Sequence, residues 1–228
     1  MQPKGPSRFA NDVPYCRMKA VRGSIGWKDE FSLKRLREVS KILPREFYAH
    51  STERVARELL GKILVHGPTA GRIVETEAYL GLDDKAAHAA SGLTERTRVI
   101  FGPPGHAYVY LIYGMYECLN LVAEADGIPG CVLIRALEPV TGIRLMWERR
   151  PAARRREDLA SGPGKLTLAL GIDRSHYGAD VTRGPLTVRR LHKEPEYKVQ
   201  VTPRIGIRHC SDWPLRYVIA GNPSLSRR

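Results

Sequence analysis

The sequence lacks several features that would place it in other classes of protein. No run approaches the roughly 18 consecutive apolar residues that a membrane-spanning helix needs. The first residues, 1–8, contain no apolar segment of the kind found in a secretory signal. Four cysteines are scattered along the chain without a Cys-x-x-Cys pair, which argues against a disulfide framework. We therefore expect a cytoplasmic chain with reduced thiols.

The motifs of metal-dependent and covalent catalysis are also missing. The seven histidines show neither His-x-x-x-His nor Glu-x-x-His spacing, and the zinc deaminase pattern is absent. No Gly-x-Ser-x-Gly segment marks a serine nucleophile. Between residues 71 and 139 the only lysine is Lys85, in an expected loop, so a lysine nucleophile is not favoured either. We expect no metal site.

Basic residues are abundant, and they are unevenly distributed. The 228 residues carry 37 Lys and Arg against 24 Asp and Glu, a formal net charge of +13. The excess lies in residues 1–50 and 139–228, whereas residues 51–138 are slightly acidic. Basic flanks around a carboxylate-bearing centre are typical of a protein that binds a polyanion and does its chemistry in the middle.

The N-terminal part of the chain predicts a loosely ordered basic arm over residues 1–42. Prolines and glycines interrupt it, and only residues 30–42 show a helical pattern. The remaining residues, 43–228, show no internal repeat and no linker, so we expect them to form one compact domain.

Three short apolar runs in the centre carry polar residues that a buried strand does not need. They are residues 72–80 with Glu75 and Glu77, residues 107–113 with three tyrosines, and residues 131–137 with Arg135. Length and β-branched or aromatic content predict a strand for each run. Charged groups rarely occupy such strands unless they are paired or functional. The three runs therefore predict a pocket.

Alternation along the first run places Ile73, Glu75, Glu77 and Tyr79 on one face of the strand. Two carboxylates side by side allow one to raise the pKa of the other. The pattern alone does not decide which of the two would act. In the third run Arg135 needs an anionic partner if it is buried.

Other expected elements follow from caps and breakers. They are a helix from Ser51 or Thr52 to Gly61, a long loop over 81–105, a helix over 141–156, a helix from Pro163 to Gly171, and strands over 186–191, 202–208 and 215–220. The start of the helix at Pro163, beside Lys165, can hold a phosphate, although the segment is not a Walker A loop.

Carboxylates, aromatic rings and basic flanks together indicate one kind of chemistry. A carboxylate base serves reactions in which water attacks an oxocarbenium-like carbon. Aromatic rings stack planar bases, and they hold cationic rings best. With a surface that binds a polyanion, this combination points to cleavage of an N-glycosidic bond in DNA, which requires the base to leave the stack.

Several ordered motifs resemble one known family. They are residues 72–79 (RIVETEAY), Asp84-x-x-x-His88, residues 105–115 (GHAYVYLIYGM), Asn120, residues 132–139 (VLIRALEP) and residues 161–166 (SGPGKL). Over about residues 43–217 the chain resembles the alkyladenine (3-methyladenine, or N-methylpurine) DNA glycosylases. The loop 93–98 departs from the family's Arg-Thr-x-Arg pattern at Leu93, which affects the expected substrate range.

The resemblance implies a single-domain α+β fold around a curved antiparallel sheet with flanking helices. It implies a monofunctional glycosylase without metal or cofactor, which removes alkylated purines from double-stranded DNA and leaves an abasic site. The expected substrates are 3-methyladenine and 7-methylguanine, and hypoxanthine and ethenoadenine are further candidates. A monomer is expected, nucleoid-associated if the source is bacterial.

The resemblance also assigns roles to individual residues. Glu77 would deprotonate the attacking water, with Arg135 and the backbone carbonyl of Ile205 holding that water. The flipped base would lie between Tyr79 and Tyr110, with His88 against it and Asn120 rejecting the 2-amino group of guanine. Tyr113 would fill the gap in the duplex, and Lys165 would contact DNA. Because Tyr110 and Tyr113 fall on opposite faces of a straight strand, their two roles require a turn at Tyr113-Gly114.

Rival interpretations remain at this point. A DNA-lesion binder of the same fold could flip bases without cutting them, and an RNA- or nucleotide-directed hydrolase could share the residues. Arg135 could serve only as an ion-pair partner of Glu75 or Glu77. Tyr108 and Tyr116 are expected to be structural.

Overall fold

The computed structural model describes residues 33–38 and 40–226. Most of the predicted basic arm therefore lies outside the described residues. The elements in chain order are α1 (Leu33–Glu38), β1 (Ser40–Ile42), α2 (Arg45–Tyr48), α3 (Thr52–Glu58), β2 (Ile63–His66), β3 (Thr69–Tyr79), η1 (His88–Ser91), η2 (Arg98–Phe101), β4 (Ala107–Ile112), β5 (Tyr116–Val122), β6 (Cys131–Thr141), α4 (Ile143–Arg149), η3 (Arg156–Leu159), α5 (Pro163–Leu170), η4 (Arg174–His176), β7 (Leu186–Leu191), β8 (Val199–Thr202) and β9 (Arg216–Ile219), where η marks a 3-10 helix.

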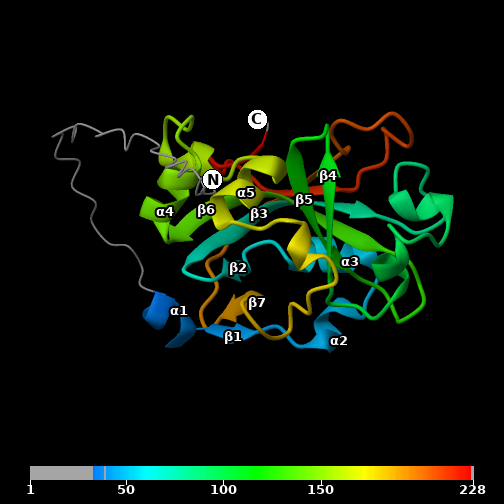
Figure 1. The fold of residues 1–228 in the computed structure, drawn as a ribbon, viewed down its shortest axis with the longest axis horizontal. Helices are drawn as coiled ribbons and strands as arrows, with labels where there is room; N and C mark the ends of the chain where they lie inside the picture. The colour runs from blue at the N-terminus through cyan, green and yellow to red at the C-terminus, as the bar shows by residue number, and fades with distance from the viewer. Residues whose placement is uncertain (1–32, 39, 227–228) are drawn as a thin grey trace, which may run out of the picture.

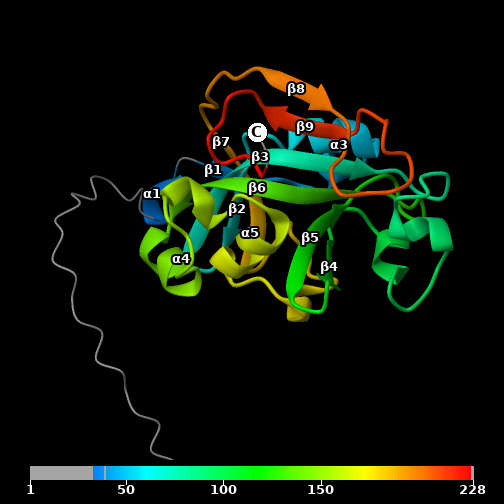
Figure 2. The same cartoon turned by 90° about the horizontal axis from the view of Figure 1, so that it is seen from above.

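The strands form one antiparallel sheet. Its order is β1-β7-β2-β3-β6-β5-β4, and β9 joins it by pairing with β3 on one side and β8 on the other. Figure 1 shows β4 and β5 as a hairpin beside the longer strands, and Figure 2 shows β8 and β9 along one side of β3. A large antiparallel sheet with a few short helices confirms the predicted single-domain α+β fold.

Some predicted boundaries were wrong, and prolines explain two of them. The helix expected over 141–156 ends at Arg149, because Pro151 cannot continue the hydrogen-bond ladder and disfavours helical geometry in the residue before it. The strand expected over 202–208 is instead β8, and the chain leaves the sheet at Pro203. The helix expected over 30–42 ends at Glu38, and β1 then pairs with β7, so the sheet begins before residue 43.

Irregularities in the longest strand pair shape the centre of the sheet. In the β3–β6 pair the register shifts between Ile73 and Glu75, and again between Glu75 and Thr76. At this point β3 exchanges its neighbour β2 for β9, which pairs with it from Glu75 to Glu77. Ile73 and Val74 both belong to the main hydrophobic core, so the strict alternation predicted from residue 73 was wrong at its start. Bulges of this kind re-aim side chains and bend a strand.

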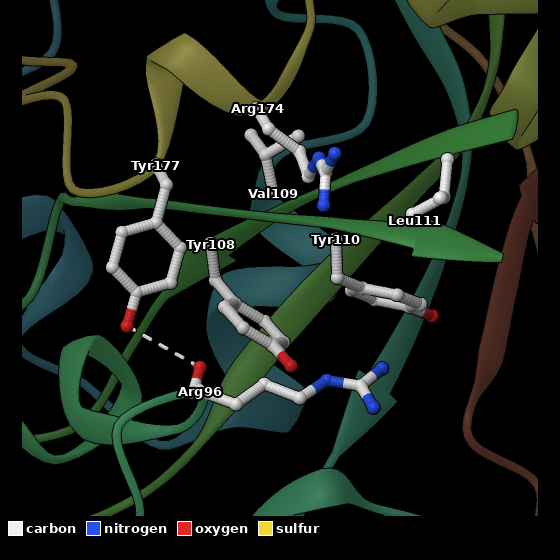
Figure 3. Close-up of a pocket in the computed structure, with 7 residues that line it drawn as sticks. All are labelled: Arg96, Tyr108, Val109, Tyr110, Leu111, Arg174 and Tyr177. Carbon is white, nitrogen blue, oxygen red and sulfur yellow. Dashed lines mark hydrogen bonds between the residues drawn. The ribbon is translucent and has the colours of Figure 1, made fainter. Parts of the chain in front are cut away.

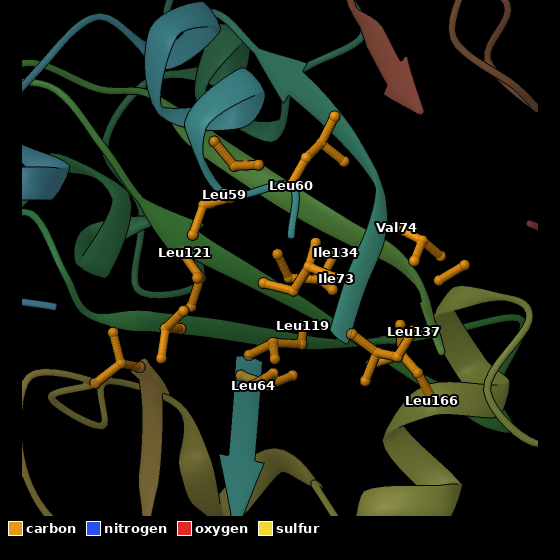
Figure 4. Packing of buried hydrophobic residues seen from close by; sticks show 14 of the residues in the cluster. Leu59, Leu60, Leu64, Ile73, Val74, Leu119, Leu121, Ile134, Leu137 and Leu166 are labelled. Atoms are coloured by element: carbon orange, nitrogen blue, oxygen red, sulfur yellow. The ribbon is translucent and has the colours of Figure 1, made fainter. Parts of the chain in front are cut away.

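The main core lies on the face of the sheet turned away from the predicted pocket. It combines the inward side chains of the central strands with apolar residues of α3 and α5, and it includes Leu59, Leu119, Ile134 and Leu166, all fully buried. Figure 4 shows this packing. A second, smaller cluster on the other face joins Ala89 and Ile100 of the long loop to Tyr108. The loop over 81–105 is therefore packed against the sheet.

Candidate active site

One row of paired residues crosses five strands and defines the face that carries the site. Tyr108 on β4 is opposite Asn120 on β5, which is opposite Leu133 on β6. Leu133 in turn is opposite Glu77 on β3, which is opposite Arg216 on β9. Residues directly opposite in a ladder share a face of the sheet. The sheet therefore brings together the polar residues of all three apolar runs, as the sequence predicted.

Glu75 is a fully buried carboxylate whose hydrogen-bonding capacity is used within the protein. Oε1 accepts from Arg135 Nε at 3.1 Å, from Arg216 Nε at 2.7 Å and from the Ser226 hydroxyl at 2.7 Å. Oε2 accepts from the Ser226 backbone N–H at 2.7 Å. A buried carboxylate held by two arginines and a backbone amide is a structural group.

Glu77 is equally buried but differently surrounded. Oε1 accepts the backbone N–H of Ile205 at 2.7 Å, and Oε2 accepts the Tyr79 phenol at 2.9 Å and Arg135 Nη1 at 3.1 Å. Burial raises the pKa of Glu77, and the Arg135 charge, the Ile205 amide and the Tyr79 phenol oppose that rise. The carboxylate is thus desolvated and fixed in orientation, which suits a general base.

Arg135 pairs with both carboxylates through different nitrogens. Its Nε contacts Glu75, and its Nη1 contacts Glu77. The second register shift of the β3–β6 pair skips Arg135, since Glu75 pairs with Ala136 and Thr76 pairs with Ile134. The predicted need for an anionic partner is met twice.

A small cavity adjoins Glu77 through the ring of Tyr79. It is lined by Tyr79, Ala86, His88, Tyr108, Tyr110, Asn120 and Cys131, and its volume is about 20 Å³. A space of this size holds a water molecule and no base. The rings of His88 and Tyr110 are in contact, with centroids 4.5 Å apart, and Tyr108 and Tyr110 are 5.3 Å apart. Entry of a planar base therefore requires these rings to separate.

His88 faces this cavity as a neutral imidazole. Its Nδ1 is 2.8 Å from the Tyr108 phenol. Burial, followed by the nearby charge of Arg96, lowers the pKa of His88 to about 4. The ring is therefore uncharged near neutral pH, and it can donate or accept a hydrogen bond without repelling a cation.

Asn120 is buried at the bottom of the cavity and held in one orientation. Its Nδ2 donates to the Tyr108 carbonyl at 3.2 Å, and its Oδ1 lies 3.9 Å from Cys131 Sγ. Asn120 lines the cavity together with Tyr79 and Tyr110, as the sequence predicted.

The predicted turn at Tyr113-Gly114 is present. Both residues have positive φ, 52° and 71°, at the tip of the β4–β5 hairpin. Tyr113 is 81% exposed, which is exceptional for so large a ring. Tyr116, by contrast, lies against Gly164, where even a Cβ would be 2.8 Å from the Tyr116 side chain. Tyr113 is therefore available to an external partner, whereas Tyr116, which is 42% exposed, rests one side of its ring on α5.

A wide groove opens beside the cavity along β4. Its lining includes Arg96, Tyr108, Tyr110, Arg174 and Tyr177, and its volume is about 720 Å³. Figure 3 shows the Arg96 guanidinium close to the rings of Tyr108 and Tyr110, and its carbon is 5.5 Å from the Tyr110 centroid. Two exposed arginines beside the partly exposed rings of Tyr110 and Tyr177 suit a phosphate chain with unstacked bases.

Lys165 lies in the first turn of α5, with its side chain exposed and Nζ 3.4 Å from the Ser161 hydroxyl. Pro163 occupies the start of that helix as predicted, and Gly171 ends it. The free amides of this helix terminus and the lysine present positive potential to solvent.

Sequence reasoning missed several residues that complete the site. The Ile205 backbone N–H bonds Glu77, whereas only its carbonyl had been considered. Arg216 and Ser226 hold Glu75 from the C-terminal part of the chain, and no local pattern marks them. Asp84, from the Asp84-x-x-x-His88 motif, and Arg204, next to Ile205, form a buried ion pair to which sequence reasoning gave no role.

Comparison with known proteins identifies a matching family and several similar proteins. The model of the methylpurine-DNA glycosylase family matches residues 46–223. A Methanocella arvoryzae protein with the provisional name 3-methyladenine DNA glycosylase is 51% identical over 195 residues, covering 82% of this chain and 96% of its own. Proteins with the same provisional name from Methanoculleus marisnigri (50% identical, 82% and 99% covered) and Chlorobaculum tepidum (47% identical, 82% and 91% covered) are also similar.

The family match, with a small aromatic-lined cavity beside a buried carboxylate on one face of the sheet, defines a hydrolase of the DNA glycosylase class. This chain belongs to the methylpurine-DNA glycosylase family, and its substrate is DNA that carries alkylated bases. Within the part of the chain that the structure describes, no helix is long and apolar enough to cross a membrane.

Proposed function

We propose that this protein flips alkylated purines out of duplex DNA and hydrolyses their N-glycosidic bond with a water activated by Glu77. The observation that carries the proposal is the position of Glu77. Its carboxylate is buried and accepts hydrogen bonds from the Ile205 amide, the Tyr79 phenol and Arg135. The Tyr79 ring also lines the cavity, so the carboxylate is bonded directly to the cavity wall. The expected first substrate is 3-methyladenine, followed by 7-methylguanine; hypoxanthine and ethenoadenine are further candidates.

The reaction needs a base and a leaving group, and it needs no covalent enzyme intermediate. The water oxygen forms a bond to C1′ while the bond from C1′ to the purine nitrogen breaks, and the purine takes that electron pair. The water proton passes to Glu77. Arg135 and the Ile205 carbonyl are proposed to hold the water. The residues that line the cavity include no lysine, which supports a monofunctional reaction that ends at an abasic site.

The pocket favours a planar cation. Tyr79 and Tyr110 provide ring faces, which attract cationic rings more than neutral ones. His88 is neutral because its pKa is about 4, so it does not repel a positively charged base. An alkylated purine that carries a positive charge is also a good leaving group. Stacking and leaving-group ability therefore select the same bases.

Asn120 is proposed to exclude normal guanine. It is buried, and its amide group is fixed by the Tyr108 carbonyl and Cys131. A guanine 2-amino group at the bottom of the cavity would collide with this side chain, which cannot turn away without losing its bond to the Tyr108 carbonyl. A site discriminates strongly against a base whose binding leaves a buried polar group without its hydrogen-bond partner.

The surface around the pocket supports binding of duplex DNA. Tyr113 stands exposed on the hairpin tip and is proposed to fill the space that the flipped base leaves. Lys165, on the helix that contacts β5, and the groove arginines Arg96 and Arg174 present exposed cations around the β4–β5 hairpin. Phosphate contacts of this kind fix the position of a duplex and carry no sequence information.

Release of free base from methylated duplex DNA tests the proposal. The wild-type chain should release alkylated purines, and Glu77→Gln should lower the rate by about 10²–10⁴-fold while it retains binding to lesion-containing DNA, because this is the typical contribution of general base catalysis. Glu75→Gln is not an equivalent control, since Glu75 is a structural group. Undiminished release by Glu77→Gln would remove Glu77 as the base, and binding without any release by the wild type would favour a lesion binder.

A further inference from the structure

Asp84 and Arg204 form an ion pair that is completely buried beside the pocket. The exposed fraction of both side chains is 0%. Arg204 donates through Nη1 to Oδ2 of Asp84, and through Nη2 to Oδ1 at 2.8 Å, so the pair is bidentate. Two charges removed from water are a large cost for a stable fold, and an apolar pair of similar volume would often stabilise it as well. The pair is therefore a candidate for a role beyond stability.

Asp84 fixes the start of the loop that carries His88. Its carboxylate accepts the backbone N–H of Leu80 at 3.0 Å and that of Ala86 at 3.1 Å. Leu80 follows the last residue of β3, and Ala86 lines the cavity two residues before His88. One carboxylate thus joins the end of β3 to the wall of the pocket.

Arg204 packs on the Tyr79 ring and restricts its movement. Its guanidinium carbon lies 4.7 Å from the Tyr79 ring centroid, and its Nη1 donates to the Ala78 carbonyl at 3.0 Å. Arg204 is fully buried and lies outside the cavity lining, so it covers the face of the ring that is turned away from the cavity. A planar cation against a ring restricts the tilt of that ring.

The residue after Arg204 reaches the proposed general base. The backbone N–H of Ile205 donates to Glu77 Oε1 at 2.7 Å. The position of Arg204 determines where this amide lies, because the two are adjacent in the chain. A single ion pair therefore connects the three segments that carry Glu77 and Tyr79, His88, and Ile205.

We propose that Asp84 and Arg204 are positioning residues for base excision, which hold the Tyr79 ring and the Ile205 amide in the arrangement that Glu77 needs. This inference rests on the proposed function. Neither residue touches the reacting atoms; each acts through a neighbour. Through its backbone contacts, the pair keeps the Tyr79 ring, which holds the base, at a fixed distance from the Glu77 carboxylate, which activates the water.

The forked geometry of arginine is essential to this role. Lysine would keep the charge opposite Asp84, but it has no planar group to lie on Tyr79 and no second nitrogen for a bidentate bond. Arg204→Lys should therefore fold, and should release base from methylated duplex DNA at least ten times more slowly in single-turnover conditions, with lesion binding reduced less than the rate.

A pH profile separates positioning from a purely structural role. The Ile205 amide stabilises the charged form of Glu77, so a displaced amide raises the pKa of Glu77 further. The acid limb of the rate profile for Arg204→Lys should move to higher pH. Arg45→Lys is the matched control, because Arg45 forms an ion pair with Asp180 outside the cavity lining. It should leave the rate and the acid limb unchanged.

A double variant covers the case in which Arg204→Lys does not fold. Asp84→Asn with Arg204→Met removes both charges together, so no buried charge is left unpaired. It should show the same slow release and the same shift of the acid limb. If either folded variant keeps the wild-type rate and acid limb, the positioning role is overturned. The proposed function still stands in that case, provided that Glu77→Gln is inactive. Absence of release by the wild type would overturn both.

Discussion

The phenol of Tyr79 donates a hydrogen bond to Oε2 of Glu77 at 2.9 Å, two residues earlier on the same strand. Burial and the neighbouring carboxylate raise the pKa of Tyr79, so the phenol stays protonated and remains a donor. This hydrogen bond therefore couples the ring proposed to stack on the base to the carboxylate proposed to activate the water. A change at one of them alters the other.

Tyr79→Phe should keep the stacking ring and lose only this donor. A hydrogen bond to a charged group is worth about 1.5–3 kcal/mol, which corresponds to about one to two pH units. The pKa of Glu77, already raised by burial, should rise further. Because the base must be ionised, the acid limb of the rate profile should lie at higher pH in Tyr79→Phe than in the wild type. The rate of base release as a function of pH measures the shift. Tyr108→Phe, whose phenol contacts His88, is the control; equal acid limbs in the two variants would contradict the argument.

Glu75→Gln should destabilise the fold more than Glu77→Gln does. Glu75 receives four hydrogen bonds, two of them from the guanidinium groups of Arg135 and Arg216. The Glu75 carboxylate forms two buried ion pairs and the Glu77 carboxylate forms one, and disruption of a buried ion pair costs up to about 3–5 kcal/mol. Denaturant unfolding measures the difference. Glu77→Gln serves as the comparison, because it weakens the ion pair with Arg135 and leaves both ion pairs of Glu75 in place; equal losses of stability would show that Glu75 has no special structural role.

Local pattern predicted the central strands and the helix that starts at Pro163, because alternation and a proline at N1 are properties of neighbouring residues. The turn at Tyr113-Gly114 was expected from the two roles that the family resemblance gives Tyr110 and Tyr113. It did not predict that Ile73 leaves the face of Glu75. That departure comes from a register shift opposite β6, and so depends on a strand more than 50 residues away in the sequence.

The same limit applies to the site. Glu77, Arg135 and the tyrosines stand out because charged or phenolic groups interrupt apolar runs. Arg216 and Ser226 lie in ordinary C-terminal sequence, and only the pairing of β9 with β3 brings Arg216 to Glu75. From local pattern alone Glu75 and Glu77 were equivalent; their different partners in three dimensions distinguish the structural carboxylate from the candidate base.

His88 should remain neutral down to about pH 4. In the folded protein its pKa is about 4, against an ordinary value of 6.5. Between these values the unfolded chain binds a proton that the folded chain does not, so stability should rise with pH across this window and fall as the pH is lowered through it. Histidine NMR resonances give the titration directly, and His88→Gln should flatten the dependence of unfolding free energy on pH from 4 to 6.5. A His88 titration near its ordinary value would contradict this.

Tyr113 and Tyr116 should respond differently to truncation, although they are only three residues apart. Tyr113→Ala removes a ring that is 81% exposed, so stability should change by no more than about 0.5 kcal/mol. If the ring fills the gap left by a flipped base, lesion binding should weaken about tenfold or more, equivalent to about 1.4 kcal/mol. Tyr116→Ala removes a ring that packs against Gly164, and it should cost about 1 kcal/mol of stability with a smaller effect on lesion binding. Both are measured in the Glu77→Gln background, which prevents turnover, with undamaged duplex as the reference; equal losses of lesion binding would mean that Tyr113 is not the residue that fills the gap.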